Sequence, residues 1–195
     1  METTRASLLL RIRDRDDSAA WAEFDAIYRP ILTRLCMARG FDQSGTDDIV
    51  QQCMLTVHRH IGGFEYDQAK GRFKSWLRTM AINQMKNQWR GQQEVQGGTS
   101  LGVGEAASIE SPEQAFDKIW MEEHLSYCLQ AIRNEIEPHA YEAFRLYALE
   151  ERSPEEVCAQ VGMEPAQLYR LKYKVTQRLA DKMRELLGDE ELEAE

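Results

Sequence analysis

The sequence predicts an all-α protein made of two small helical domains joined by a flexible linker. The chain has 195 residues, a length that suits one or two domains. Apolar residues recur at helical spacing along most of the chain, and no sustained alternation of apolar and polar residues predicts a strand. Residues 91–111 hold five glycines and no aromatic or basic residue, a composition typical of a flexible linker.

Composition excludes several classes of protein. Apolar residues make up 43% and charged residues 29% of the chain, which argues against a disordered protein and against a membrane protein. The cysteines are far apart and lie among apolar neighbours, so we interpret them as small buried side chains and not as disulfides or metal ligands. The N-terminus has acidic residues and no signal-peptide core, so we expect a cytoplasmic protein.

The helical pattern and the linker together define the expected domains. Helices are predicted at residues 7–15, 18–39, 46–61 and 72–89, and after the linker at 112–136, 138–149, 153–161 and 165–187. Thr46 is the expected N-cap of the third helix, and Pro30 predicts a kink in the second. The expected organisation is an N-terminal domain at 1–92, a linker at 93–111, a C-terminal domain at 112–188 and an acidic tail at 189–195.

The last two predicted helices have the pattern of a helix-turn-helix. Ser153 begins a capping box with Pro154 and Glu156, and Gly162 allows a tight turn. The second helix buries leucines and a valine on one face. Its other face carries groups that can reach base edges and phosphates in a major groove: Ala166, Gln167, Arg170, Tyr173, Lys174 and Gln177. The alternative is an ordinary helical hairpin with a solvated face.

Basic residues are concentrated in two segments of an acidic chain. The net charge is −9, yet residues 58–90 hold seven Lys or Arg against two acids, and residues 168–184 hold six against Asp181 alone. Two basic strips suit two local contacts with a polyanion. Two solvated helix faces are the alternative.

The third and fourth predicted helices each have an unusual outward face. On the third helix, a leucine lies among polar groups, which suggests a protein interface, although a single exposed leucine is common. The residues of this face are Asp48, Gln51, Gln52, Leu55 and Arg59. The fourth helix and the loop before it combine aromatic, hydrogen-bonding and basic groups that suit unstacked single-stranded bases: Phe64, Tyr66, Arg72, Thr79, Asn83, Lys86 and Arg90. The alternative for Phe64 and Tyr66 is that they pack on the helix.

Three segments in this order resemble a known family. They are TDDIVQQ at 46–52, GFEYDQAKGRFKSWLRTMAINQ at 63–84 and YEAFRLYALEERSPEEVCAQVGMEPAQLYRLKYKVTQRL at 141–179. Together they resemble an RNA polymerase sigma factor of the extracytoplasmic-function (ECF) group, within the sigma-70 superfamily. Departures include Gln52, where the family usually has Glu, and Thr79 with Met80, where housekeeping sigma factors carry strand-separating tryptophans.

The resemblance implies partners and roles. The partners would be core RNA polymerase and promoter DNA, with an anti-sigma protein as a further candidate, and no cofactor, metal or membrane is expected. The N-terminal domain would bind core polymerase through Asp48, Gln51 and their neighbours. It would also bind the downstream promoter element, with Phe64 and Asn83 capturing a flipped base. Arg170, Tyr173 and Lys174 would read the upstream promoter element.

Two other readings remain open from the sequence. A helix-turn-helix transcriptional regulator could bind duplex DNA without engaging polymerase, but it would leave the third helix's outward face without a role. An enzyme is not expected, because no catalytic motif is present. His58 and His60 are two residues apart and so point to different sides of a helix, a poor metal pair.

Overall fold

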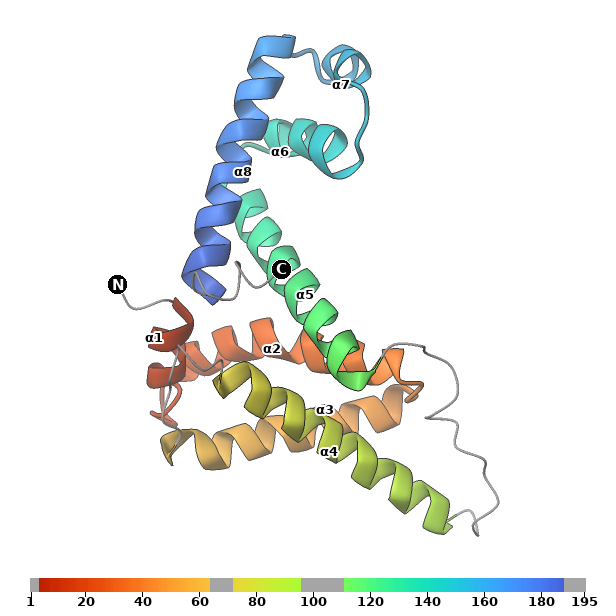
Figure 1. The fold of residues 1–195 in the computed structure, drawn as a ribbon. Helices are drawn as coiled ribbons and strands as arrows, with labels where there is room; N and C mark the ends of the chain where they lie inside the picture. The colour runs from red at the N-terminus through yellow and green to blue at the C-terminus, as the bar shows by residue number, and fades with distance from the viewer. Residues whose placement is uncertain (1–3, 64–71, 96–110, 188–195) are drawn as a thin grey trace. The chain divides into compact units, whose positions relative to one another are not determined.

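The computed structural model describes residues 4–63, 72–95 and 111–187 (Figure 1). These residues form helices and turns and no strand, so the predicted all-α class is confirmed. The chain divides into two compact units. Unit 1 contains the described residues up to Glu123, and unit 2 runs from His124 to the end of the described residues at Leu187.

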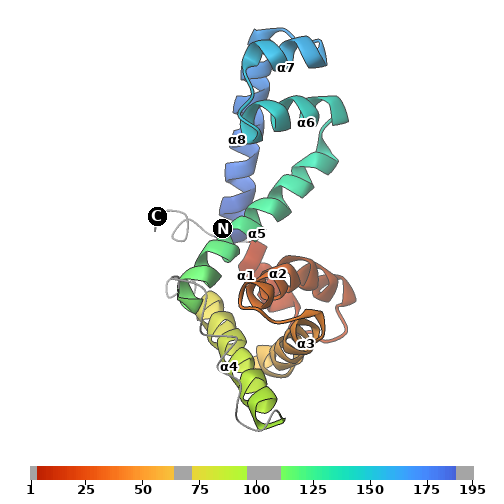
Figure 2. The ribbon, with the colours of Figure 1, turned by 90° about the vertical axis from the view of Figure 1, so that its right-hand side faces the viewer.

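Unit 1 is built from four helices and the first half of a fifth. They are α1 (Thr4–Arg11), α2 (Ser18–Ala38), α3 (Gln43–His60), α4 (Arg72–Val95) and residues 112–123 of α5 (Pro112–Glu135); a 3-10 turn, η1 (Ile61–Gly63), follows α3. Helix α3 packs against both α2 and α4 (Figures 1 and 2). Inside α2, Pro30 is exposed, and the helix continues beyond it.

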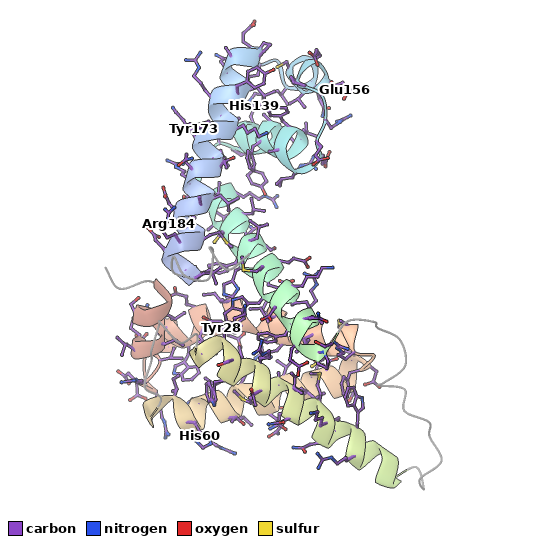
Figure 3. The ribbon with its side chains drawn as sticks, in the orientation of Figure 1. Tyr28, His60, His139, Glu156, Tyr173 and Arg184 are labelled. Atoms are coloured by element: carbon purple, nitrogen blue, oxygen red, sulfur yellow. The ribbon has the colours of Figure 1, made fainter. Side chains whose placement is uncertain are left out.

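Aromatic side chains fill the core of unit 1. The ring of Tyr28 on α2 lies 4.5 Å from that of Phe24 and 5.1 Å from that of Phe73 on α4, measured between centroids (Figure 3). Trp120 of α5 adds a further ring 5.7 Å from Tyr28, and it is completely buried. This packing ties the first half of α5 to unit 1, whereas the sequence led us to expect a C-terminal domain that begins at residue 112.

Two helix ends in unit 1 differ from their expected positions. Helix α3 begins three residues earlier than expected, because Asp42 and not Thr46 is its N-cap: the Asp42 side chain accepts a hydrogen bond of 2.8 Å from the Gly45 backbone. Thr46 is instead fully buried. Helix α4 continues past Gly91 to Val95, so the first residues of the predicted linker are helical. Residues 96–110 of that linker lie outside the described residues.

Unit 2 contains the rest of α5 and the C-terminal helices. They are α6 (Pro138–Phe144), the π-helical turn η3 (Arg145–Leu149), α7 (Pro154–Val161) and α8 (Pro165–Leu187). The expected helix at 138–149 is thus split between α6 and η3. Two clusters of buried apolar side chains hold the unit together: Ala143, Leu146, Val157 and Leu168 in one, and Ile132, Phe144 and Val175 in the other. Lys182 of α8 pairs with Glu135 of α5 at 2.7 Å.

The cysteines fit their expected role as small core residues. Cys36, Cys53 and Cys128 are buried and unbridged, and Cys158 is half-buried. Burial raises the pKa of Cys36 and of Cys53 to about 12, so both thiols are neutral at physiological pH. None of the helices in the described part of the chain has the length and apolar character needed to cross a membrane.

Candidate protein and nucleic-acid interfaces

Helix α3 presents a polar face with one leucine, which we call the α3 stripe. The stripe consists of Asp48, Gln51, Gln52, Leu55 and Arg59, and all five side chains are exposed. It arises because Ile49, Val50, Cys53 and Val57 are buried on the opposite side of the same helix. Leu55, the apolar member of the stripe, is 39% exposed. The stripe therefore offers a rigid, accessible surface to a partner.

The C-terminal end of α3 packs against α2. The His58 ring lies 5.0 Å from the Trp21 ring of α2, between centroids. His60 is exposed and lies at the end of the helix (Figure 3). The described residues contain no group of three or more side chains that could hold a metal ion.

Helix α4 carries a second exposed face, the α4 face, formed by Thr79, Asn83, Lys86 and Arg90. Phe73, Leu77 and Met80 are buried on the other side, and Trp76 is half-buried. The Thr79 hydroxyl donates to the Ser75 carbonyl at 2.8 Å, within the helix. The amide of Asn83 is exposed between these groups. Phe64, Tyr66 and the side chain of Arg72 lie outside what the structure describes.

A stacked aromatic pair supports the α4 face, and the sequence reasoning missed it. The Trp89 ring of α4 stacks on Phe41, which precedes α3, with centroids 4.9 Å apart and planes 15° from parallel. The stack fixes the part of α4 that carries Lys86 and Arg90. The sequence signal was the spacing of Trp89, four residues after the buried Met85. Nothing in the spacing identifies Phe41 as its partner.

Helix α8 carries the third exposed face, the α8 face. Its members are Ala166, Gln167, Arg170, Tyr173, Lys174 and Gln177, and all six are exposed. Tyr173 is 68% exposed and projects from the helix (Figure 3). The Arg170 Nε donates to the Ala166 carbonyl at 3.1 Å, which leaves the terminal guanidinium nitrogens available to other acceptors. The Gln167 Oε1 accepts from the Glu164 backbone at 3.3 Å and so caps the start of α8.

Local backbone chemistry sets the turn between α7 and α8. Ser153 accepts a hydrogen bond of 3.3 Å from the Glu156 backbone, which confirms the expected N-cap. Gly162 ends α7 in the left-handed conformation, with φ of 67°. A ring nitrogen of His139 on α6 lies 2.6 Å from the Val161 carbonyl and ties α6 to this turn (Figure 3). These contacts hold the start of α8 in place.

Basic and aromatic side chains beside the α8 face also support it. Lys172 Nζ lies 4.8 Å from the centre of the Tyr147 ring, a cation–π contact between α8 and η3. The Tyr169 ring meets the Tyr147 ring edge-on, with centroids 5.9 Å apart. Lys172 was counted among the basic residues of segment 168–184, and here it stabilises the unit.

Comparison with known protein families identifies the helices that carry the α3 stripe and the α4 face. The family model of sigma-70 region 2 matches residues 26–95. The matched segment begins within α2 and includes all of α3 and α4, so it contains the α3 stripe and the α4 face. A search of the curated proteins gave no match. The chain therefore contains a sigma-70 region 2 domain, and the resemblance seen in its N-terminal motifs is confirmed at that level.

Proposed function

We propose that the protein is an RNA polymerase sigma factor of the ECF group, which directs core polymerase to specific promoters and aids strand opening. One observation carries this proposal: the sigma-70 region 2 match coincides with the helices that bear the α3 stripe and the α4 face. Region 2 of sigma-70 proteins binds core RNA polymerase. The protein would act without catalysis of its own, by holding polymerase and promoter together.

The α3 stripe is the proposed polymerase contact. An exposed leucine flanked by glutamines, an aspartate and an arginine combines an apolar centre with a polar rim, as protein interfaces do. Its side chains are not needed for the core of unit 1, since α3 packs on α2 and α4 through its other face.

The α4 face and the α8 face are the proposed promoter contacts. Asn83, with Phe64 and Tyr66 from the preceding loop, would receive an unstacked base of the downstream element, while Lys86, Arg90 and Arg72 would contact phosphates. Arg170, Tyr173 and Lys174 would reach the upstream element in the major groove. The exposure of Asn83 and of the α8 face supports this proposal.

Binding to core polymerase tests the proposal against a regulator that engages DNA alone. We expect Asp48→Ala with Leu55→Ala to weaken binding of bacterial core polymerase by at least about tenfold, since central interface side chains contribute more than about 1 kcal/mol each. Fluorescence anisotropy with labelled protein measures the affinity. The circular dichroism spectrum should not change, because both side chains are exposed.

A matched control exists in the same unit. Asp16→Ala with Leu10→Ala removes the same residue types from the exposed surface near α1, where Leu10 is 42% exposed against 39% for Leu55. This control should bind core polymerase like the unaltered chain. Equal affinity of both double variants would favour a regulator that does not engage polymerase.

A further inference from the structure

Helix α8 carries cations that no other part of the described chain neutralises. Three of the six Lys and Arg side chains in residues 168–184 have partners in unit 2: Lys172 with the Tyr147 ring, Lys182 with Glu135, and Arg184 with Asp181 (Figure 3). The other three are exposed, and none of them pairs with a described acidic residue; they are Arg170, Lys174 and Arg178. We call these three side chains the α8 row.

The α8 row is a regular series of like charges along one side of the helix. Its members are four residues apart, so they repeat about every 6 Å along the helix axis, and each is turned roughly 40° from the one before. Like charges at this spacing repel each other. The row therefore favours an anionic partner whose charges repeat at a similar distance.

The acidic tail, residues 189–195, has such a repeat. It reads DEELEAE and follows the end of α8 after a single glycine. Glu191, Glu193 and Glu195 alternate with uncharged residues. In an extended segment, alternate side chains point to the same side and repeat about every 6.6 Å. The three glutamates thus match the α8 row in number, in spacing and, with opposite sign, in charge.

The length of the tail also suits the row. Measured back from the end of α8 along the helix axis, Arg178 is roughly 14 Å away and Lys174 roughly 20 Å away. An extended segment that turns back along the helix covers about 13 Å by Glu191 and about 20 Å by Glu193. The two acids that precede Glu191 are too near the end of the helix to reach the row.

We propose that the acidic tail folds back along α8 and competes with promoter DNA for the α8 row. The ion pairs are Glu191 with Arg178, Glu193 with Lys174, and Glu195 with Arg170. This inference rests on the proposed function in taking the α8 face as a DNA contact, because Arg170 and Lys174 belong to that face. Acidic blocks are common interaction segments. Since the tail and a duplex cannot hold the same cations at once, the tail lowers the affinity of the free chain for DNA.

Zero-length cross-linking of the full chain tests the docked tail directly. A carbodiimide joins a carboxylate to an ammonium group when the two are in contact, and mass spectrometry locates the products. Lys174 should form an amide with a tail glutamate within one chain, and Lys182 with Glu135 is the positive control. Lys172 is also exposed but lies roughly 160° around α8 from Lys174, so it is the matched negative control. A random-sequence duplex should abolish the Lys174 cross-link and leave the positive control unchanged.

Duplex affinity, measured by anisotropy, tests the competition. The chain with Glu191→Gln, Glu193→Gln and Glu195→Gln should bind a random-sequence duplex roughly fivefold more tightly than the unaltered chain at low salt, a modest gain because exposed ion pairs are individually weak. About 0.5 M salt should remove this advantage by screening. The matched control removes three exposed carboxylates from unit 2 outside α8 and should gain less: Glu137→Gln, Glu151→Gln and Glu155→Gln.

Core polymerase binding, measured in parallel, separates this proposal from the proposed function. With polymerase binding intact, a Lys174 cross-link no stronger than that of Lys172 would overturn the docked tail and leave the sigma-factor proposal standing. Tail cross-links between two chains, or equal gains in duplex affinity from both triple variants, would overturn it as well. A Lys174 cross-link that persists beside bound duplex would overturn the competition. A chain that docks its tail but does not bind polymerase fails the proposed function instead.

Discussion

Arg170 is a single side chain whose surroundings allow a definite expectation. Its Nε is engaged by the Ala166 carbonyl, while its remaining donors point from an exposed face of α8. Two parallel donors of an arginine match the O6 and N7 acceptors of guanine. Lys174, one turn along, presents a point charge without such geometry, which suits a phosphate.

We expect Arg170→Ala and Lys174→Ala to weaken DNA binding in different ways. Arg170→Ala should lose about 1–3 kcal/mol of preference for the cognate upstream element over a scrambled duplex. Lys174→Ala should weaken both duplexes alike and lower the salt slope by about 1. Anisotropy titrations with the two duplexes measure this. Equal weakening of both duplexes by Arg170→Ala would make Arg170 a phosphate contact and transfer the specificity to Tyr173 or Gln167.

At the residue scale, the sequence predicted which side chains are exposed better than what they contact. The α3 stripe, the α4 face and the α8 face all lie on exposed surfaces, because helical periodicity alone determines the side that turns away from the core. Three contacts carried no such signal: the Phe41–Trp89 stack, the pairing of Lys74 and Arg78 with Asp117, and the use of Gln167 as a cap. The first two depend on a partner that only the tertiary structure brings near, whereas Gln167 caps through Glu164, three residues before it.

At the scale of elements, helices were easier to predict than their ends and their neighbours. A sustained period of 3.6 residues fixes the existence of α2, α4 and α8. Asp42 and Thr46 are both good N-caps, so the sequence did not decide between them; in the structure Asp42 caps α3 and Thr46 is buried inside the helix. The unit that α5 joins was also undetermined, since an apolar face with Phe116 and Trp120 can pack against any complementary surface.

Two glycines should respond in opposite ways to the same substitution. Gly91 lies within α4, and Gly162 ends α7 with φ of 67°; neither has an atom within 4 Å of an added Cβ. Gly91→Ala should stabilise the protein by about 0.5 kcal/mol through helix propensity. Gly162→Ala should destabilise it by about 1 kcal/mol, because a Cβ disfavours the left-handed region. Urea unfolding followed by circular dichroism measures both.

The Gly91 result also bears on where α4 ends. A stabilising effect requires that Gly91 is helical in solution, as in the structure. No effect, or a loss of stability, would place the end of α4 before residue 91 and restore the linker boundary that the glycine-rich composition predicted. Gly162→Asn provides the control for the α7 turn, since Asn tolerates the left-handed region and should cost less than Ala.

At the scale of the whole molecule, the proposed function assigns the two units to different steps. Unit 2 would read duplex DNA before it opens, through Arg170 and its neighbours. Unit 1 would contact a base that exists as a ligand only after the strands separate, through Asn83. A chain with a net charge of −9 can perform both tasks, because its basic residues are concentrated in residues 58–90 and 168–184.

Substitutions in the two units should therefore affect different stages of initiation. Asn83→Ala should leave closed-complex formation nearly intact and reduce the open complex by roughly fivefold, the effect of losing one hydrogen bond of about 1 kcal/mol. Permanganate reactivity of unpaired thymines measures the open complex, and a promoter with a pre-melted bubble should restore initiation by Asn83→Ala.

Arg170→Ala should reduce closed-complex formation, and the bubble should not restore it at limiting factor. Because the two side chains lie in different units, the losses of the double variant should multiply. If Asn83→Ala instead lowers closed-complex formation and pre-melting gives no rescue, the α4 face contacts duplex and not an unpaired base.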